Sequence, residues 1–114
     1  MRARRPRSQY ERRHVNPVRE RALAQLREMV LAALGEHDAA VYLFGSSARG
    51  NARPGSDIDI GILPRGELRE LFFFDLIETI DDSTIPYDVE LVDLREVSRD
   101  FLDEVRRTGV VWRA

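Results

Sequence analysis

The spacing of apolar residues predicts helices in three parts of the chain. Between residues 17 and 34 apolar positions recur every three or four residues, as in a helix that buries one stripe and shows Arg and Glu to solvent. Asn16 and Pro17 are typical of a helix start, and Gly35 of a helix end. Similar spacing predicts helices over 67–80 and 98–107. The expected inward-facing residues are Leu23, Leu26, Val30, Ala33 and Leu34 in the first helix, Leu68, Leu71, Phe72, Leu76 and Ile80 in the second, and Phe101, Leu102 and Val105 in the third.

Shorter apolar segments between these helices predict strands over 41–44, 57–63 and 87–92. In the second of them Ile58, Ile60 and Ile62 alternate, so they are expected on the core face. Residues 45–55 are predicted to form a Gly-Ser turn and a loop with room for one helical turn. Residues 110–113 suit either a short last strand or an exposed tail. This order of elements predicts a small α/β or α+β domain with a sheet at its centre.

Composition narrows the class of protein. The 114 residues suffice for one domain with a real core, and 43% hydrophobic and 33% charged residues are typical of a globular protein. No apolar run approaches the ~20 residues of a membrane span. The sequence has no cysteine, which excludes disulfides and thiolate metal sites. We therefore expect a cytoplasmic protein.

Charge divides the chain into two parts. All 18 basic residues are arginine, and eight of them lie in residues 1–21 beside only two acidic residues. From residue 22 onward ten arginines accompany eighteen acidic residues, a net charge of −8. We expect residues 1–16 to form a basic, flexible arm and residues 17–114 to form the folded domain. The acidic domain argues against nucleic acid as the main partner.

Two pairs of acidic residues interrupt the predicted strands. Asp57 and Asp59 alternate on one strand, and Asp88 and Glu90 alternate on another. If these strands are neighbours, three or four carboxylates converge, and their mutual repulsion requires a neutralising cation. Such a cluster can hold two Mg²⁺ ions about 4 Å apart, as in enzymes of phosphoryl transfer. For Asp57 and Asp59 taken alone, a solvated strand edge is the alternative interpretation.

The turn before the aspartate strand supplies the other half of such a site. Gly45 lets the backbone approach a phosphate, and the amides of Ser46 and Ser47 would open a helical turn that attracts anions. Arg49 lies in the same loop, where it either contacts phosphate or pairs with a nearby acid. The sequence contains no lysine, which excludes a Walker A loop. The predicted ligand is therefore a nucleoside triphosphate seated on the turn, with its metal ions on the paired aspartates.

The spacing of these residues resembles a known signature. Gly45-Ser46, ten residues and then Asp57-Ile58-Asp59 are similar to the Gly-Ser-x10-Asp-x-Asp signature of the nucleotidyltransferase superfamily that includes DNA polymerase β. The short chain and the segments "GSSARG", "SDIDI", "YDVELVDL" and "GVVW" resemble its minimal nucleotidyltransferase (MNT) branch over nearly the whole chain from residue 17. The resemblance implies the small nucleotidyltransferase fold, a central mixed sheet flanked by helices.

The resemblance also implies roles for individual residues. Gly45 and Ser46 would hold the triphosphate, and Asp57 and Asp59 would bind Mg²⁺. A third carboxylate would bind one metal ion and help to deprotonate the attacking hydroxyl. The family usually has Asp at that position, which Glu90 matches here, with Asp88 as the alternative. The implied catalytic and metal-binding residues are thus Asp57, Asp59 and Glu90, and the nucleotide-binding residues are Gly45, Ser46, Ser47 and Arg49.

Minimal proteins of this kind resemble antitoxins that transfer AMP from ATP to a tyrosine hydroxyl of a small helical HEPN ribonuclease toxin. The resemblance therefore implies a Mg-dependent protein adenylyltransferase that neutralises a HEPN-type toxin within a hetero-oligomer. A binding module that neutralises its partner by contact alone is the second interpretation, because Glu90 departs from the usual Asp. Transfer to a small molecule, as in the aminoglycoside nucleotidyltransferases, is the third, and it is expected to need a further domain.

Overall fold

The computed structural model describes residues 16–50, 53 and 55–114. Apart from Asn16, the predicted basic arm lies outside these residues. Within the described part of the chain, no helix is both long enough and apolar enough to cross a lipid bilayer.

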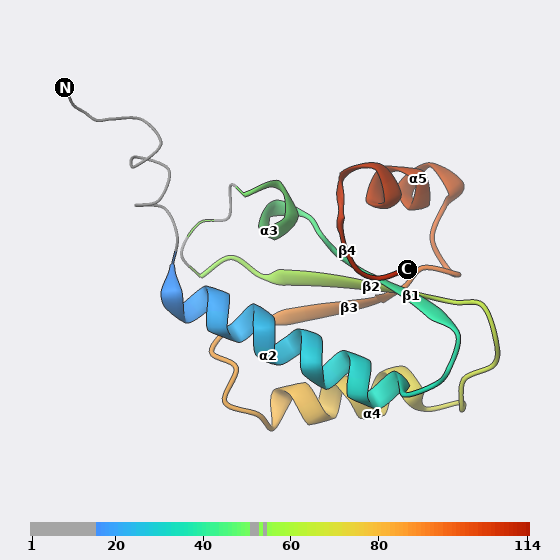
Figure 1. The fold of residues 1–114 in the computed structure, drawn as a ribbon, viewed down its shortest axis with the longest axis horizontal. Helices are drawn as coiled ribbons and strands as arrows, with labels where there is room; N and C mark the ends of the chain where they lie inside the picture. The colour runs from blue at the N-terminus through green and yellow to red at the C-terminus, as the bar shows by residue number, and fades with distance from the viewer. Residues whose placement is uncertain (1–15, 51–52, 54) are drawn as a thin grey trace.

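A single four-stranded mixed sheet organises the fold. The elements in chain order are α2 (Pro17–Leu34), β1 (Ala39–Phe44), α3 (Ser46–Arg49), β2 (Ile58–Pro64), α4 (Phe72–Asp81), β3 (Val89–Asp93), α5 (Arg99–Thr108) and β4 (Val110–Arg113). The strand order is β3-β2-β1-β4; β1 pairs antiparallel with β2 and β4, and β2 pairs parallel with β3. Helices α2 and α4 lie on one side of the sheet, and α3 and α5 lie on the other (Figure 1). The predicted α/β architecture, with a central mixed sheet and flanking helices, is confirmed.

Helix α2 begins and ends where its capping residues predict. The Asn16 side-chain oxygen accepts hydrogen bonds from the amides of residues 18 and 19, at 3.0 and 3.2 Å, and Gly35 follows the last turn with φ +56°. The buried stripe consists of Arg19, Ala22, Leu26, Val30 and Leu34. Ala33 is exposed, contrary to the prediction, because the stripe passes directly from residue 30 to residue 34. The expectation that the arginines of this helix face solvent is wrong for Arg19.

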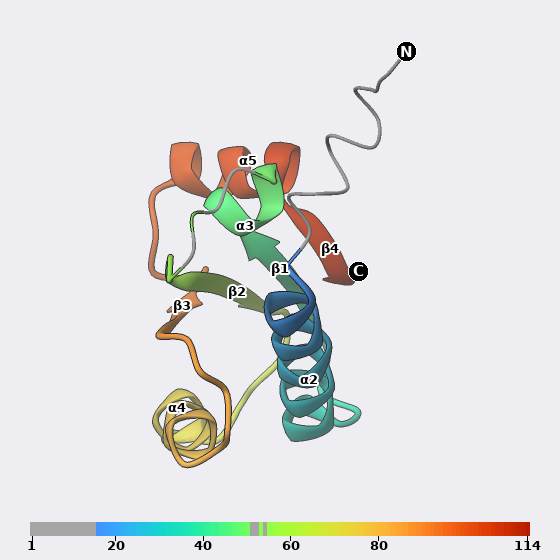
Figure 2. The same ribbon diagram turned by 90° about the vertical axis from the view of Figure 1, so that its left-hand side faces the viewer.

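The hydrophobic core lies between the sheet and helices α2 and α4. Ile58, Ile60 and Ile62 are fully buried, as their alternation in β2 predicts. Figure 2 shows both helices against the same face of the sheet. Burying each of these side chains stabilises the fold by about 1.5–3 kcal/mol. Because successive strand residues point to opposite faces, the residues between the isoleucines face the other side.

Helix α4 is shorter than the predicted 67–80. It begins at Phe72, after an irregular segment over 67–71, and it ends at Asp81. Leu68 packs against the core from that irregular segment, so its spacing from Phe72 imitates a helical turn that the backbone does not make. The helical prediction required Leu71 to be buried, but its side chain is 58% exposed.

Helix α5 begins one residue after its Ser98 cap, whose hydroxyl oxygen accepts a hydrogen bond from the Phe101 amide at 3.1 Å. Val105 is buried and Leu102 is half-buried, as predicted. Phe101 is 40% exposed, contrary to the prediction, because it packs at the margin of the sheet, edge-on against Phe44, the last residue of β1. Residues 110–113 form the strand β4, the first of the two alternatives for this segment.

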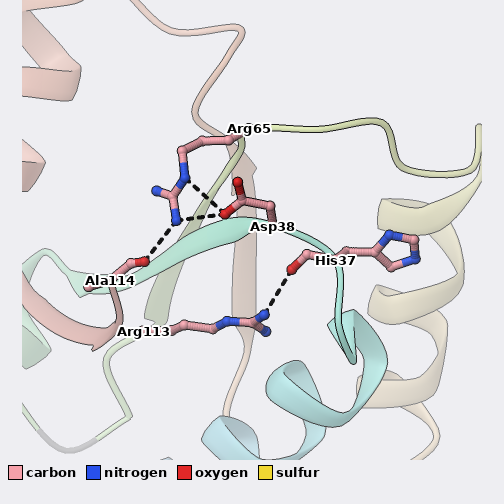
Figure 3. A network of polar contacts seen from close by, with 5 residues as sticks. All are labelled: His37, Asp38, Arg65, Arg113 and Ala114. Atoms are coloured by element: carbon pink, nitrogen blue, oxygen red, sulfur yellow. Dashed lines mark hydrogen bonds and ion pairs between the residues drawn. The ribbon is translucent and has the colours of Figure 1, made fainter.

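A polar network ties the end of the chain to the sheet (Figure 3). Arg65 donates hydrogen bonds to Asp38 (3.0 Å) and to the backbone oxygen of Ala114 (2.8 Å), and Arg113 donates to the backbone oxygen of His37 (2.8 Å). The ion pair in this network is largely exposed, so it contributes about 0–1 kcal/mol. The network lies where β1 begins and β2 ends, which leaves the opposite ends of these strands to the acidic residues and the Gly-Ser turn.

Candidate active site

The strand pairing brings Asp59 and Glu90 together. Strands β2 and β3 are neighbours, which is the condition for their acidic residues to meet, and their register pairs these two residues directly. On the other side of β2, Asp59 is paired with Phe44 of β1. Paired residues on adjacent strands share a face of the sheet. The isoleucines of β2 occupy the core face, so the row Phe44, Asp59, Glu90 lies on the opposite face.

The carboxyl group of Asp59 lies in an unfavourable electrostatic environment. Burial raises its pKa above the usual value, and the charge of Glu90, a hydrogen bond with Glu90 and the charge of Asp57 raise it further. The positive charge of Arg19 lowers the pKa, but this is the weakest of the effects. A cation bound beside these groups would relieve the repulsion. The site offers oxygen donors, which are the ligands that Mg²⁺ prefers, so these residues fit a divalent cation.

Gly45 joins the turn to the carboxylates. Its backbone has φ +75° and ψ −153°, a conformation almost restricted to glycine. A Cβ atom at this position would overlap the Asp59 carboxylate oxygen Oδ2 and lie 3.3 Å from Cγ. The missing side chain therefore lets the backbone of the turn lie directly against Asp59. The two halves of the sequence signature, ten residues apart along the chain, meet at this contact.

The turn after Gly45 is the short helix α3. The Gly45 backbone oxygen accepts hydrogen bonds from the amides of Ala48 (3.1 Å) and Arg49 (3.2 Å), which closes one helical turn. The amides of Ser46 and Ser47 stand at the start of this turn, where a helix has no carbonyl of its own to satisfy them. Arg49 ends the helix and is exposed. The predicted nucleotide-binding residues thus form one continuous turn beside the Asp59 carboxylate.

Asp57 and Asp88 lie just before the two strands that carry Asp59 and Glu90. Asp57 precedes β2 and is exposed, although its charge reaches Asp59. Asp88 precedes β3 and is exposed, and its backbone oxygen accepts a hydrogen bond from the Ile58 amide at 2.9 Å. Across the described residues, no three acidic or histidine side chains converge closely enough as they stand to hold one metal ion. Glu90, and not Asp88, is the residue that the register sets beside Asp59.

Arg19 is a site residue that sequence reasoning missed. It is 7% exposed, and its guanidinium donates hydrogen bonds to the Ser47 hydroxyl oxygen (2.8 Å) and to the backbone oxygens of Ser56 (3.0 Å) and Asp57 (3.3 Å). It also lies over the ring of Tyr87, 4.8 Å from its centroid. A signal was present in the sequence, because Arg19 continues the buried stripe of α2 at helical spacing.

Comparisons with known proteins agree with this geometry. The family described as "Polymerase beta, Nucleotidyltransferase" matches residues 33–112. The chain is 35% identical over 74 residues to a Haemophilus influenzae protein named "Probable protein adenylyltransferase MntA", and the match spans 65% of this chain and 65% of that protein.

Two solved structures resemble the fold at similar levels. One, described as a toxin–antitoxin with AMP-PNP, has a TM-score of 0.59 at 29% identity and covers 75% of this chain and 71% of the matched chain. The other is described as a tri-AMPylated HEPN toxin of Shewanella oneidensis in complex with MNT antitoxin. It has a TM-score of 0.59 at 25% identity and covers 82% of this chain and 70% of the matched chain.

Proposed function

Because the chain belongs to the polymerase β nucleotidyltransferase family, we propose that it transfers AMP from ATP to a hydroxyl group of a partner protein. The partner in this proposal is a HEPN-type toxin, the acceptor is a tyrosine, and the modification neutralises the toxin. The H. influenzae relative is named as a protein adenylyltransferase, and one structural relative is described as an antitoxin bound to an AMPylated HEPN toxin. These names support both the reaction and the kind of partner.

The observation that carries the proposal is the contact between the Gly45 backbone and the Asp59 carboxylate. A nucleotidyl transfer needs phosphate-binding and metal-binding residues close to each other, since a bound metal ion would neutralise charge on the phosphate groups. The pairing of Asp59 with Glu90 adds a second carboxylate on the same face. A solvated strand edge would account for neither the close approach of Gly45 nor the paired carboxylates.

Each residue has a role in the proposed reaction. The amides of Ser46 and Ser47 would hold the triphosphate, and Asp57, Asp59 and Glu90 would hold two Mg²⁺ ions. The acceptor hydroxyl oxygen attacks the α-phosphorus of ATP. The bond between the α-phosphorus and the oxygen that bridges it to the β-phosphorus breaks, and pyrophosphate leaves. Glu90 accepts the hydroxyl proton. When bound, Mg²⁺ neutralises the carboxylates and stabilises the charge on the attacking and leaving oxygens.

Arg49 has two possible partners in this proposal. It is exposed at the end of α3, one turn from Ser46, where a guanidinium can pair with a phosphate. No ion pair between Arg49 and an acidic side chain is present among the described residues. We therefore favour the phosphate for Arg49.

Intact-mass spectrometry of the protein purified with its partner tests the proposal. We expect the partner's mass to rise by one or more AMP units after incubation with Mg·ATP. The double variant Asp57→Asn with Asp59→Asn should leave the partner unmodified, because it removes metal ligands. The control double variant Asp81→Asn with Asp82→Asn changes the charge equally at exposed positions at the end of α4, and it should retain transfer.

Neutralisation by contact alone is the second candidate function. The observation that favours it is Glu90, which replaces the usual Asp with a side chain one methylene longer, and general-base geometry is sensitive to such a change. In that case the Asp57/Asp59 double variant would still neutralise the toxin as well as the wild type does. A tight complex without any mass change, in a protein that still binds nucleotide, would also favour this candidate.

A further inference from the structure

Arg19 is a charged side chain in an unusual position. Among the described residues it is the charged side chain that is buried, at 7% exposure. Burying a guanidinium is costly unless its donors are satisfied. Its Nε atom has no hydrogen-bond partner within the described residues, so the site retains this arginine without satisfying it completely. The remaining contacts of Arg19 should therefore explain why this position carries a buried arginine.

The contacts of Arg19 reach three separate segments. Its guanidinium bonds to the Ser47 hydroxyl in α3, and to the backbone oxygens of Ser56 and Asp57 just before β2. Its guanidinium carbon lies over the ring of Tyr87, just before β3, 4.8 Å from the ring centroid. Each segment carries candidate site residues: the turn that begins at Gly45, the entry to β2 with its aspartates, and the entry to β3 with its glutamate. A single side chain from α2 therefore touches all three parts of the site.

The chemistry of a guanidinium explains why arginine suits this place. Its planar fork donates in several fixed directions at once and can stack on an aromatic ring with its face. A lysine carries the same charge but lacks both the fork and the flat face. Arg19 forms no ion pair with an acidic side chain in the part of the chain that the structure describes. Its charge acts instead on Asp59 at longer range.

We infer that Arg19 is a positioning residue that holds the Gly-Ser turn and the entries to β2 and β3 in register for nucleotide binding. This inference rests on the proposed function for its kinetic consequences, but not for its structural ones. Because Ser47 accepts its hydrogen bond from Arg19, the hydroxyl proton of Ser47 stays free to donate elsewhere. A residue that served only overall stability would affect all parts of the fold alike.

Hydrogen exchange in the full chain, without nucleotide, tests the positioning role directly. In Arg19→Met we expect amide exchange to accelerate about tenfold or more in peptides covering 46–49 and 56–59, relative to peptides of α2 that report global opening. Arg19→Lys should behave in the same way, because it keeps the charge but not the fork. Arg21→Met, on the exposed side of the same helix, is the matched control and should match the wild type.

The kinetic readout separates positioning from stability. We expect both Arg19 variants to raise the KM for Mg·ATP about tenfold and to lower kcat, with less than a threefold difference between Lys and Met. If the Arg19 variants fold too poorly to measure, Ser47→Ala removes one acceptor without removing the buried charge. Its exchange should accelerate in 46–49 while 56–59 stays close to the wild type.

Two results would overturn the inference. One is an exchange rate in both peptides within twofold of the Arg21→Met control. The other is an Arg19→Lys variant that matches the wild type, because charge alone would then suffice. A different result would show that the proposed function is wrong: the wild type would leave its partner unmodified. Accelerated exchange in the Arg19 variants would still support the positioning role in that case.

Discussion

Replacing Gly45 by alanine probes the contact on which the candidate site depends. The substitution adds one methyl group, changes no charge and removes no hydrogen-bonding group. Its effect therefore comes from two sources only, which are the strained backbone at residue 45 and the collision of the new Cβ with the Asp59 carboxylate.

Both contributions can be given a magnitude. An L-residue at φ +75° and ψ −153° costs about 1–3 kcal/mol. For a domain of this size that corresponds to a fall in Tm of about 5–20 °C. The new Cβ overlaps Asp59 Oδ2, so the carboxylate must turn away from the row that it shares with Glu90. Because the substitution displaces both the Asp59 carboxylate and the phosphate-binding turn, we expect affinity for Mg·ATP to fall more than about tenfold.

Gly50→Ala is the matched control for this experiment. Gly50 has the same φ of +75°, but an added Cβ there meets no atom of the described residues within 4 Å. Its ψ of +13° lies in the left-handed helical region, where an alanine costs about 1 kcal/mol. Urea unfolding measures the stability of both variants, and calorimetric titration with Mg·ATP measures their affinity. The difference in affinity reports the collision with Asp59, whereas the difference in stability combines that collision with the more costly backbone conformation of Gly45.

A Gly45→Ala variant that is no less stable than Gly50→Ala and binds Mg·ATP with wild-type affinity would contradict both the backbone strain and the collision with Asp59. A loss of stability with unchanged affinity would confirm the backbone strain. It would also separate the Gly-Ser turn from nucleotide binding, so the proposed site would be wrong even though the fold is described correctly.

Three further substitutions test the energetics of the fold and the site. Gly61→Ala places a Cβ 2.9 Å from a methyl carbon of Leu94, and this overpacking should cost about 1–3 kcal/mol in urea unfolding; an unchanged midpoint would show that Leu94 moves freely. The hydrogen bond from Arg95 lowers the pKa of Asp93, so the stabilisation it gives is present above the unfolded pKa and is lost as pH falls through the folded pKa. Asp93→Asn should therefore cost about 0.5–1 kcal/mol at neutral pH and nothing at low pH, and a loss that is independent of pH would contradict this cause. The pKa of Asp59 is raised, chiefly by burial, so its ionised form destabilises the metal-free fold as pH rises; Asp59→Asn in EDTA should be more stable than the wild type near neutral pH, with a gain that disappears below about pH 4. Equal stability of the variant and the wild type across that range would contradict a raised pKa for Asp59.

Local signals made much of the fold predictable. Asn16, Pro17 and Gly35 mark both ends of α2 because capping depends on residues within one turn. The alternating isoleucines identify β2 and its buried face because the strand period is two. The start of α4 was not predictable in this way. Leu68 reaches the core from an irregular segment, and apolar spacing alone does not distinguish that from a helical turn.

Some features of the candidate site were likewise predictable from local sequence, and others were not. The sequence alone determined the oxygen-donor set, the absence of thiolate and lysine chemistry, and the spacing between Gly45 and the aspartates. Only the tertiary structure decided that β2 and β3 are parallel neighbours with Asp59 opposite Glu90, and that Arg19 of α2 contacts all three site segments. These contacts join residues about thirty to seventy positions apart. They depend on how the whole chain packs, because no local period or capping rule acts over such a separation.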